Sequence, residues 1–219
     1  MSVHLANAQG RASVVLGGRL VDVERASKGR FSSDPMAVIQ HWDAFVQWAA
    51  GLRDSDAGTP LREEELGPPV PRPSKVFGIG MNYREHAKEA GLDIPKSPVV
   101  FTKFPNCLVG PRADVVLSSA FVDWEVELVV VIGRRGRRVA AAQAFDYIAG
   151  YCVGQDISDR RIQFADIPPQ FSMGKSIDTF GPIGPAMVSI SMSGASIIGA
   201  PFITRASISS WLPEFRSRW

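Results

Sequence analysis

Four prolines in six residues divide the chain into two stretches of different pattern. The run Pro68-Pro69-Val70-Pro71-Arg72-Pro73 lacks most of its backbone N–H donors and holds the chain extended. We therefore predict a boundary here, with a small N-terminal domain in residues 1–70 and a larger domain in residues 71–188.

Before the proline run, the pattern predicts a hairpin followed by a helix. Apolar residues alternate on both sides of Gly17-Gly18, which is typical of two strands joined by a tight turn. Over residues 36–51 the apolar positions follow helical spacing, with Asp34 as the N-cap and Pro35 at the first helical position. Residues 1–70 are thus predicted to form a small α/β unit.

After the proline run, the pattern is dominated by short apolar runs. They predict four strands, at residues 75–80, 99–103, 126–132 and 148–155, with a helical segment over residues 83–90 between the first two.

Two glutamates stand two residues apart where the third of these strands begins. Alternate side chains project from one face of a strand, so Glu125 and Glu127 are expected to lie side by side. The apolar residues that follow them indicate a strand buried on both faces. Two like charges in such a place repel each other unless a cation neutralises them. The alternative is a strand that begins at an exposed rim, with both glutamates solvated.

A third acid follows the next predicted strand. Asp156 stands where residues 148–155 turn into a helix, and Arg160 and Gln163 share its helical face by their i, i+4, i+7 spacing. Three carboxylates without histidine or cysteine suit Mg²⁺ or Mn²⁺ better than Zn²⁺.

His86 and Glu89, three residues apart in the predicted helical segment, form a candidate acid–base pair. A carboxylate beside an imidazole orients it and raises its basicity, which suits activation of a water molecule. The alternative is an ordinary solvated contact on a surface helix. Lys175 lies in a loop rich in glycine and proline, and by itself it indicates no more than a surface lysine.

Charge and composition exclude several classes of partner. The net charge of +2 provides no long-range field that favours nucleic acid or membrane, and the basic run 134–138 is expected to be a solvated turn. The N-terminus shows no leader pattern, and the longest apolar stretch is too short to cross a bilayer. Cys107 and Cys152 lack metal-type spacing and are expected to be buried thiols in a reducing compartment. We therefore expect a cytoplasmic protein.

Four motifs, taken in order along the chain, resemble the fumarylacetoacetate hydrolase family. They are residues 77–83 with His86 and Glu89, residues 123–128, residues 150–163 and residues 174–182. The resemblance runs from about Ser74 to Pro185. It implies an α+β class with a mixed, β-rich catalytic fold, usually assembled as a homodimer. It also implies a divalent metal, Mg²⁺ or Mn²⁺, chelated by the 2-oxo acid end of a small-molecule substrate.

The resemblance assigns roles position by position. The implied metal ligands are Glu125, Glu127 and Asp156. The implied catalytic residues are His86, Glu89 and Lys175. The implied substrate contacts are Arg160, Gln163 and Lys175. Ile79 stands where the mammalian hydrolase branch has a fourth carboxylate, which places the chain nearer the acylpyruvase and hydroxymuconate isomerase or decarboxylase branches.

The enzyme implied by the resemblance is a metal-dependent hydrolase that cleaves a C–C bond in a small β-diketo or 2-oxo acid, such as an acylpyruvate. His86, oriented by Glu89, would deprotonate the attacking water, while Lys175 would donate to the developing oxyanion. The nearest alternative is an isomerase or decarboxylase of hydroxymuconate-type dicarboxylates. There, His86 would serve a proton transfer instead of hydrolysis.

The resemblance ends after about Val188. Residues 189–219 are serine-rich and contain a single acid, Glu214, and no lysine. This change of composition indicates a divergent tail from a truncated or frame-shifted gene. A further alternative is therefore a non-catalytic remnant, which Mg²⁺-dependent turnover by the 219-residue chain would eliminate.

Overall fold

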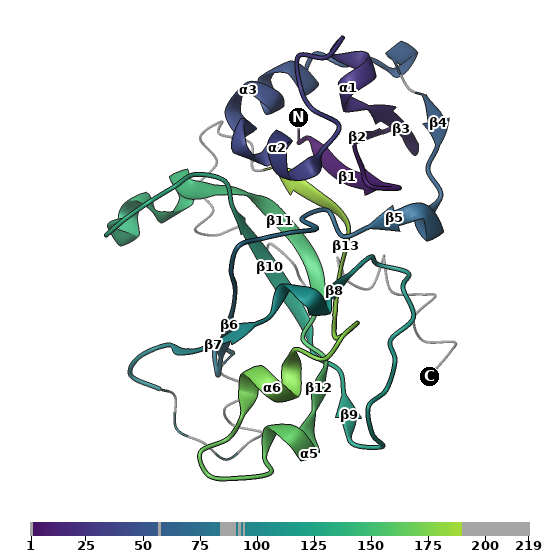
Figure 1. Ribbon diagram of the computed structural model, residues 1–219. Helices are drawn as coiled ribbons and strands as arrows, with labels where there is room; N and C mark the ends of the chain where they lie inside the picture. Colours follow the sequence, from purple (N-terminus) through teal and green to yellow (C-terminus); the bar gives the residue numbers. More distant parts are fainter. Residues whose placement is uncertain (1, 57, 84–90, 92, 94, 190–219) are drawn as a thin grey trace.

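A computed structural model describes residues 2–56, 58–83, 91, 93 and 95–189 (Figure 1). The strands are β1 (His4–Ala8), β2 (Arg11–Leu16), β3 (Arg19–Asp22), β4 (Thr59–Pro60), β5 (Leu66–Gly67), β6 (Val76–Gly80), β7 (Val99–Lys103), β8 (Leu108–Val109), β9 (Val122–Asp123), β10 (Val126–Ile132), β11 (Ile148–Gln155), β12 (Ser158–Asp159) and β13 (Gly181–Ser189). The α-helices are α1 (Val23–Ala26), α2 (Pro35–Gln40), α3 (Trp42–Ala49), α5 (Arg160–Gln163) and α6 (Phe171–Lys175). The 3-10 helices are η1 (Asp54–Asp56), η2 (Glu63–Glu65), η3 (Pro105–Cys107) and η4 (Ala141–Tyr147).

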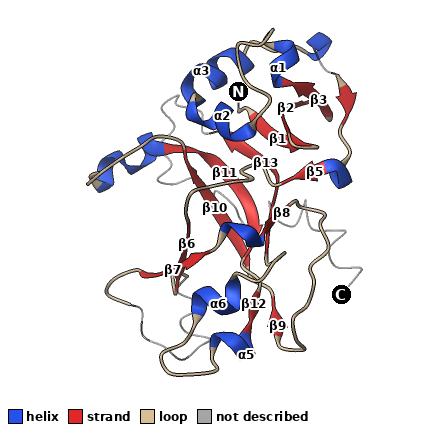
Figure 2. Cartoon of the chain, viewed as in Figure 1, coloured by secondary structure: helices blue, strands red, loops and turns tan. Residues whose placement is uncertain are grey.

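One large sheet joins the two halves of the chain. Its strands follow the order β10-β11-β13-β1-β2-β3-β4, with β5 paired to β1 and β8 paired to β13. Strands and helices are both present, which confirms the predicted α+β class. In Figure 2, α1, α2 and α3 lie near the top of the molecule and α5 and α6 near the bottom, with most of the sheet between them. Two further sheets, β12-β9 and β6-β7, each consist of two antiparallel strands.

The junction between the N-terminal segment and the rest of the chain is the antiparallel pair β1–β13. His4 lies opposite Val188, and Leu5 lies opposite Met187. A single buried cluster extends across this junction, from Phe45 in the N-terminal segment to side chains of β10, β11 and β13. The two halves therefore share a sheet and a core. The predicted boundary between two domains at residue 70 stays a prediction.

The hairpin predicted around Gly17-Gly18 is present as β2 and β3. Leu16 pairs with Arg19, so the two glycines are the whole turn. Their φ angles are +55° and +73°, which is the left-handed pair of conformations that a type I′ turn requires. Glycine adopts these angles at low cost, and the turn thereby fixes the register of both strands.

The predicted helix after the hairpin is present but interrupted. Asp34 caps α2 through a 3.0 Å bond from the Met36 amide to its carboxylate, and Pro35 occupies the first turn, as predicted. At His41 the backbone turns to φ −115°, ψ 36°, and its N–H bonds to the carbonyl of Val38. The chain therefore forms two short helices, α2 and α3, where the sequence pattern predicts one.

Strands β10 and β11 have the bounds predicted from the sequence, and β6 and β7 differ by at most one residue. The prediction that β10 is buried on both faces is wrong. Val131 is buried, whereas Leu128, Val130 and Ile132 are 41%, 44% and 61% exposed. The alternation of burial arises because Val129 and Val131, on one face of β10, pack in the core, whereas the other face is exposed in the described part of the chain.

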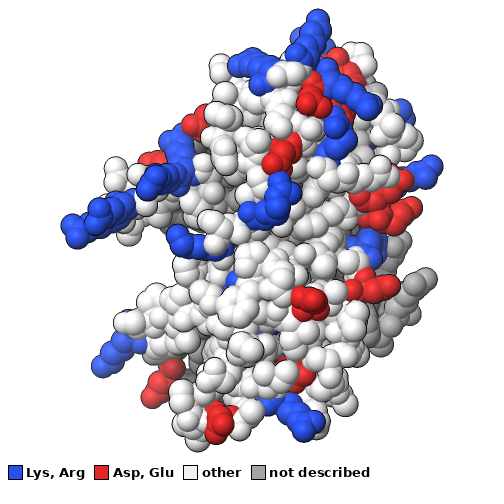
Figure 3. Space-filling view, in the orientation of Figure 1, with Lys and Arg blue, Asp and Glu red and all other residues white. Residues whose placement is uncertain are grey.

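Outside the core, the basic run behaves as the sequence indicates. Residues 134–138 form an exposed turn that leads into η4, and Arg134 pairs with Asp43 of α3 at 2.6 Å. The segment between β10 and β11 extends to the left in Figure 1, and Lys and Arg side chains gather in that region of Figure 3. Cys107 and Cys152 are buried free thiols, and burial raises the pKa of Cys152 to about 12. Within the described residues, no helix is long and apolar enough to cross a membrane.

Phe45 is expected to be a main anchor of the shared core. It is fully buried, and its ring lies 5.8 Å, 5.3 Å and 6.0 Å from the rings of Phe31, Trp42 and Trp48. Phe45→Ala should lower the free energy of unfolding by about 3–5 kcal/mol, measured by urea denaturation. Gln47→Ala, on the exposed face of the same helix, is the control and should leave stability nearly unchanged.

Candidate active site

The candidate site begins where β10 and β11 meet at one end of the sheet. Val126 pairs with Gln155 in the last rung, and the Asp156 amide continues the ladder by donating to the carbonyl of Glu125 at 2.8 Å. The backbone therefore places Glu125 and Asp156 opposite each other, although they are far apart in the sequence.

A buried lysine joins these two acids. Lys175, at the end of α6, is 3% exposed, and its ammonium group lies 3.1 Å from Glu125 Oε1 and 2.8 Å from Asp156 Oδ2. A third bond, of 2.7 Å, runs to Ser158 Oγ. Lys175 is thus a buried counter-ion rather than the surface lysine that its loop sequence alone would indicate.

The short helices α5 and α6 bring Lys175 to this place. A side chain on Gly174 would meet the backbone nitrogen of Gln163 at 2.8 Å, so only glycine permits the close approach of the two helices. The sequence alone indicated a loop around Lys175, whereas residues 171–175 form a helical turn.

We refer to Asp123, Glu125, Glu127 and Asp156 as the carboxylate cluster. Arg160 binds two of its members from the solvent side. Its guanidinium lies 2.6 Å from Glu125 Oε1 and 2.8 Å from Asp123 Oδ2, and it donates to Gln163 Oε1 at 2.9 Å. The predicted relation to Asp156 by helical spacing is wrong, because Asp156 precedes the helix and Asp159 is its N-cap. Arg160 reaches the site through Glu125 instead.

A second buried lysine was not identified from the sequence. Lys103, the last residue of β7, is 7% exposed, and its ammonium group donates to Asp156 Oδ1 at 2.7 Å. It also donates to the carbonyls of Lys175 and Phe180. The available signal was a lysine that ends a mostly apolar strand, because a lysine is seldom buried unless its charge is paired.

Glu127 is the member of the cluster whose charge is least compensated. Its carboxylate makes no hydrogen bond or ion pair with any residue that the structure describes. Burial, and then the charges of Glu125 and Asp156, raise the pKa of Glu127 above its ordinary value, and Lys175 offsets this only in part. The three predicted acids are therefore electrostatic neighbours.

Comparison with known proteins gives these residues a family. Residues 75–198, more than half of the chain, match the family described as Fumarylacetoacetate (FAA) hydrolase C-terminal. The chain belongs to this family. This confirms the resemblance seen in the four sequence motifs.

Individual members of the family show how the chain relates to longer proteins. Human mitochondrial oxaloacetate tautomerase FAHD2A is 46% identical over 131 residues, which is 59% of this chain and 42% of the human protein. The chain therefore spans less than half the length of this curated relative. A candidate HpcE protein from Mycobacterium smegmatis is 45% identical in its solved structure, with a TM-score of 0.75, covering 87% of this chain and 67% of that one.

A third member has been solved with bound ligands. The maleylpyruvate hydrolase of Sphingobium sp. SYK-6, in complex with manganese(II) and pyruvate, is 26% identical with a TM-score of 0.68. The match covers 85% of this chain and 67% of the hydrolase. The fumarylacetoacetate hydrolase family thus includes hydrolases as well as tautomerases.

The acid–base pair predicted from the family motif, His86 and Glu89, lies outside the described residues. The last described residue before it is Tyr83. Burial, and then the negative charge of Glu127, raise the pKa of Tyr83. Tyr83 therefore senses the charge of Glu127, and the roles of His86 and Glu89 stay predictions.

The described residues contain no ready-made metal site, since no three His, Cys, Asp or Glu side chains are gathered at ligand distances. The donor chemistry nevertheless fits Mg²⁺ or Mn²⁺. All three predicted ligands are carboxylates, and Glu127 lacks a cationic partner within the described part of the chain. Lys175 already binds Glu125 and Asp156, so a metal ion would have to share these two carboxylates with it.

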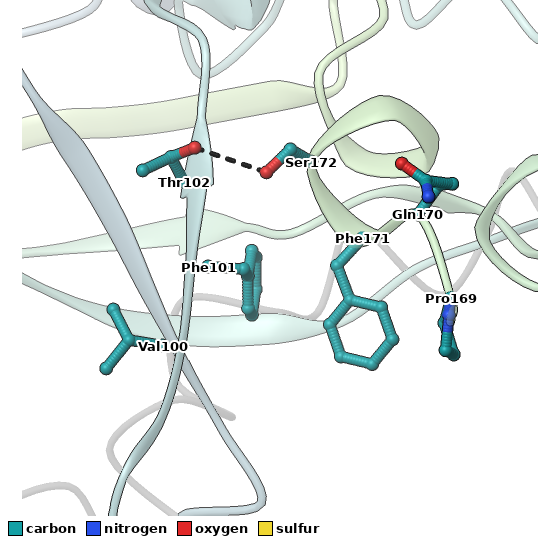
Figure 4. A pocket seen from close by; sticks show the side chains of 7 residues that line it. All are labelled: Val100, Phe101, Thr102, Pro169, Gln170, Phe171 and Ser172. Atoms are coloured by element: carbon teal, nitrogen blue, oxygen red, sulfur yellow. Dashed lines mark hydrogen bonds between the residues drawn. The ribbon is translucent and has the colours of Figure 1, made fainter. Parts of the chain in front are cut away.

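An open pocket lies next to this centre, between β7 and α6. Its volume is about 510 Å³, and it is lined by Val100, Phe101, Thr102, Pro169, Gln170, Phe171 and Ser172 (Figure 4). Thr102 and Ser172 share a hydrogen bond of 3.2 Å, and the rings of Phe101 and Phe171 meet edge to face at 5.6 Å. Lys175 Nζ lies 5.3 Å from the centre of the Phe101 ring, so this ring borders both the pocket and the buried lysine.

The raised pKa of Glu127 predicts a pH-dependent cost to folding. Below the ordinary glutamate pKa of 4.5 the side chain is neutral in both the folded and unfolded chain, so the cost is absent. Above the raised folded-state pKa, the cost is fully present. Glu127→Gln should therefore melt at a higher temperature than the wild type at pH 7 in EDTA, and the difference should vanish as the pH falls below 4.5.

The expected size of this effect is small, because water screens a half-buried carboxylate. We expect on the order of 1 kcal/mol or less, equivalent to about 2–4 °C in a chain of this size, measured by differential scanning calorimetry. Glu64→Gln, at an exposed position, is the matched control and should not shift the melting temperature. A lower melting temperature for Glu127→Gln would contradict the assignment of uncompensated charge to Glu127.

Proposed function

We propose that this chain carries the metal-binding part of an enzyme that hydrolyses a C–C bond in a small β-diketo or 2-oxo acid of the acylpyruvate type. The observation that supports the proposal most directly is that Lys175 binds both Glu125 and Asp156, while the charges of these two acids raise the pKa of Glu127. The Mn²⁺ and pyruvate bound by the related maleylpyruvate hydrolase support the same ligand chemistry for this chain.

In this proposal Glu125, Glu127 and Asp156 hold a Mg²⁺ or Mn²⁺ ion. When bound, the divalent cation supplies Lewis acidity that stabilises the enolate of a 2-oxo acid. Among the cluster residues, four carboxylates face three cations. The carboxylates are Asp123, Glu125, Glu127 and Asp156, and the cations are Lys103, Lys175 and Arg160. A divalent ion would reverse this excess negative charge and make the site attractive to an anionic substrate.

The chain's own side chains would perform the remaining steps. Lys175, desolvated and already positioned by three acceptors, would redirect one of its three N–H donors to the oxyanion that develops on the substrate. Arg160 and Gln163, which bond each other at 2.9 Å, would bind the substrate carboxylate. His86, oriented by Glu89, would take the proton from the attacking water.

The second candidate function is isomerisation, tautomerisation or decarboxylation of an oxo dicarboxylate. It is favoured by the 46% identity with human oxaloacetate tautomerase FAHD2A. In that reaction the same cation and Lys175 would stabilise an enolate, and His86 would move a proton between carbon and solvent instead of activating water. The two candidates thus differ in the fate of one proton and of one C–C bond.

Two further predictions about the protein accompany this proposal. Assembly of two copies is supported by the apolar side chains that β10 exposes at Leu128, Val130 and Ile132. A cytoplasmic location stays a prediction.

The metal part of the proposal predicts that Glu127→Ala loses Mn²⁺ binding. Glu127 has no competing partner in the described chain, so its carboxylate should contribute directly to the ion. We expect Mn²⁺ affinity to fall by at least about tenfold, or about 1.4 kcal/mol, measured by the electron paramagnetic resonance signal of free Mn²⁺. Glu64→Ala, an exposed glutamate, is the control. Equal affinity in Glu127→Ala and wild type would refute the assigned ligand set.

Substrate panels separate the two candidate functions. Purified chain with Mg²⁺ is offered acylpyruvates, hydroxymuconate-type dicarboxylates and enol oxaloacetate, and products are followed by absorbance and by mass spectrometry. Release of pyruvate from acylpyruvates supports the hydrolase, whereas proton exchange or CO₂ release without hydrolysis supports the alternative. Metal binding without turnover on any of these would favour the non-catalytic chain.

A further inference from the structure

Lys103 occupies a position that the proposed mechanism leaves unexplained. Its ammonium group is buried, comes from the separate β6-β7 sheet, and makes three bonds to other parts of the chain. The acceptors are Asp156 Oδ1, the carbonyl of Lys175 and the carbonyl of Phe180. A lysine ammonium has three N–H donors, so every one of them is used.

Burial of a charge is costly, and the geometry around Lys103 shows how that cost is offset. An ion pair of 2.7 Å with Asp156 compensates the charge, while the two carbonyls satisfy the remaining donors. The bonds place Asp156 between two lysines, with Oδ1 on Lys103 and Oδ2 on Lys175. Both oxygens of Asp156 therefore have fixed partners, and the plane of its carboxylate is defined.

Attachment of β7 to α6 does not by itself require a cation at residue 103. The Phe104 amide donates to Ser176 Oγ at 3.0 Å, and Asn106 donates to the carbonyl of Ser176 at 3.1 Å. Thr102 and Phe101 make further contacts with α6 in the pocket wall. What Lys103 adds to these neutral contacts is a positive charge directed at Asp156.

We propose that Lys103 is a positioning residue that orients Asp156, and through the carbonyl of Lys175 the end of α6, so that the carboxylate cluster is ready to bind a divalent cation. The inference rests on the proposed function, since it assigns Lys103 a role toward the same metal ion. Lys103 itself contacts neither metal nor substrate in this role. It acts on the ion only through Asp156.

The test compares three variants of the full chain by Mn²⁺ affinity, again from the resonance of free Mn²⁺. Lys103→Met keeps the length and removes the charge, and it should weaken Mn²⁺ binding by about tenfold or more. Lys103→Arg restores a cation and should recover part of the lost affinity. Asn106→Ala removes bonds to the neighbouring Ser176 carbonyl and to the Asp178 carboxylate without altering charge, and it should leave the affinity unchanged.

Each outcome decides between the positioning role and its alternatives. A folded Lys103→Met variant with wild-type affinity overturns the inference alone and leaves the proposed function intact. Equal weakening by Lys103→Met and Asn106→Ala also overturns it, because the effect then comes from attachment of β7 rather than from charge. Failure of the wild-type chain to bind Mn²⁺ rejects both the proposed function and this inference. Where Lys103→Met does not fold by circular dichroism, Lys103→Gln takes its place with the same expected loss.

Discussion

The buried ion-pair cluster around Lys175 is the interaction on which the rest of the site depends. Lys175 contacts Glu125, directly before β10, and Asp156, directly after β11, and these two residues are adjacent because the strands pair there. A buried ammonium without such partners would cost several kcal/mol, and buried carboxylates without it would cost as much. Formation of the sheet end and formation of the charge cluster are therefore coupled.

Local patterns were sufficient to predict several elements of the fold, including the two strands that flank the site. The two glycines of the first hairpin, the cap at Asp34 and the bounds of β10 and β11 all follow from rules that involve few neighbouring residues. The family motifs added Lys175 and Arg160 to the candidate site, and the structure places both in contact with Glu125. These features are predictable because their causes lie within a few residues along the chain.

The features that the sequence did not predict depend on contacts between distant segments. Whether the second face of β10 is covered depends on which segments pack over it, and in the described part of the chain Leu128 on that face is 41% exposed. Lys103 is 53 residues from Asp156, and no spacing rule relates them. The apolar spacing continues through the break at His41, so it gives no signal that the helix is interrupted there. Tertiary structure overrides local propensity at such places.

The three acids Glu125, Glu127 and Asp156 differ in how far neighbouring cations compensate their charge. Asp156 has a lysine on each oxygen, and Glu125 is shared by Lys175 and Arg160, so both carboxylates are held in place before any ligand arrives. Glu127 has no such partner among the described residues, and burial beside two like charges raises its pKa. A site built only from paired carboxylates would gain little from a cation, because its charge is already compensated. The unpaired Glu127 leaves negative charge that a divalent ion can relieve, while the paired acids provide preorganised oxygens around it.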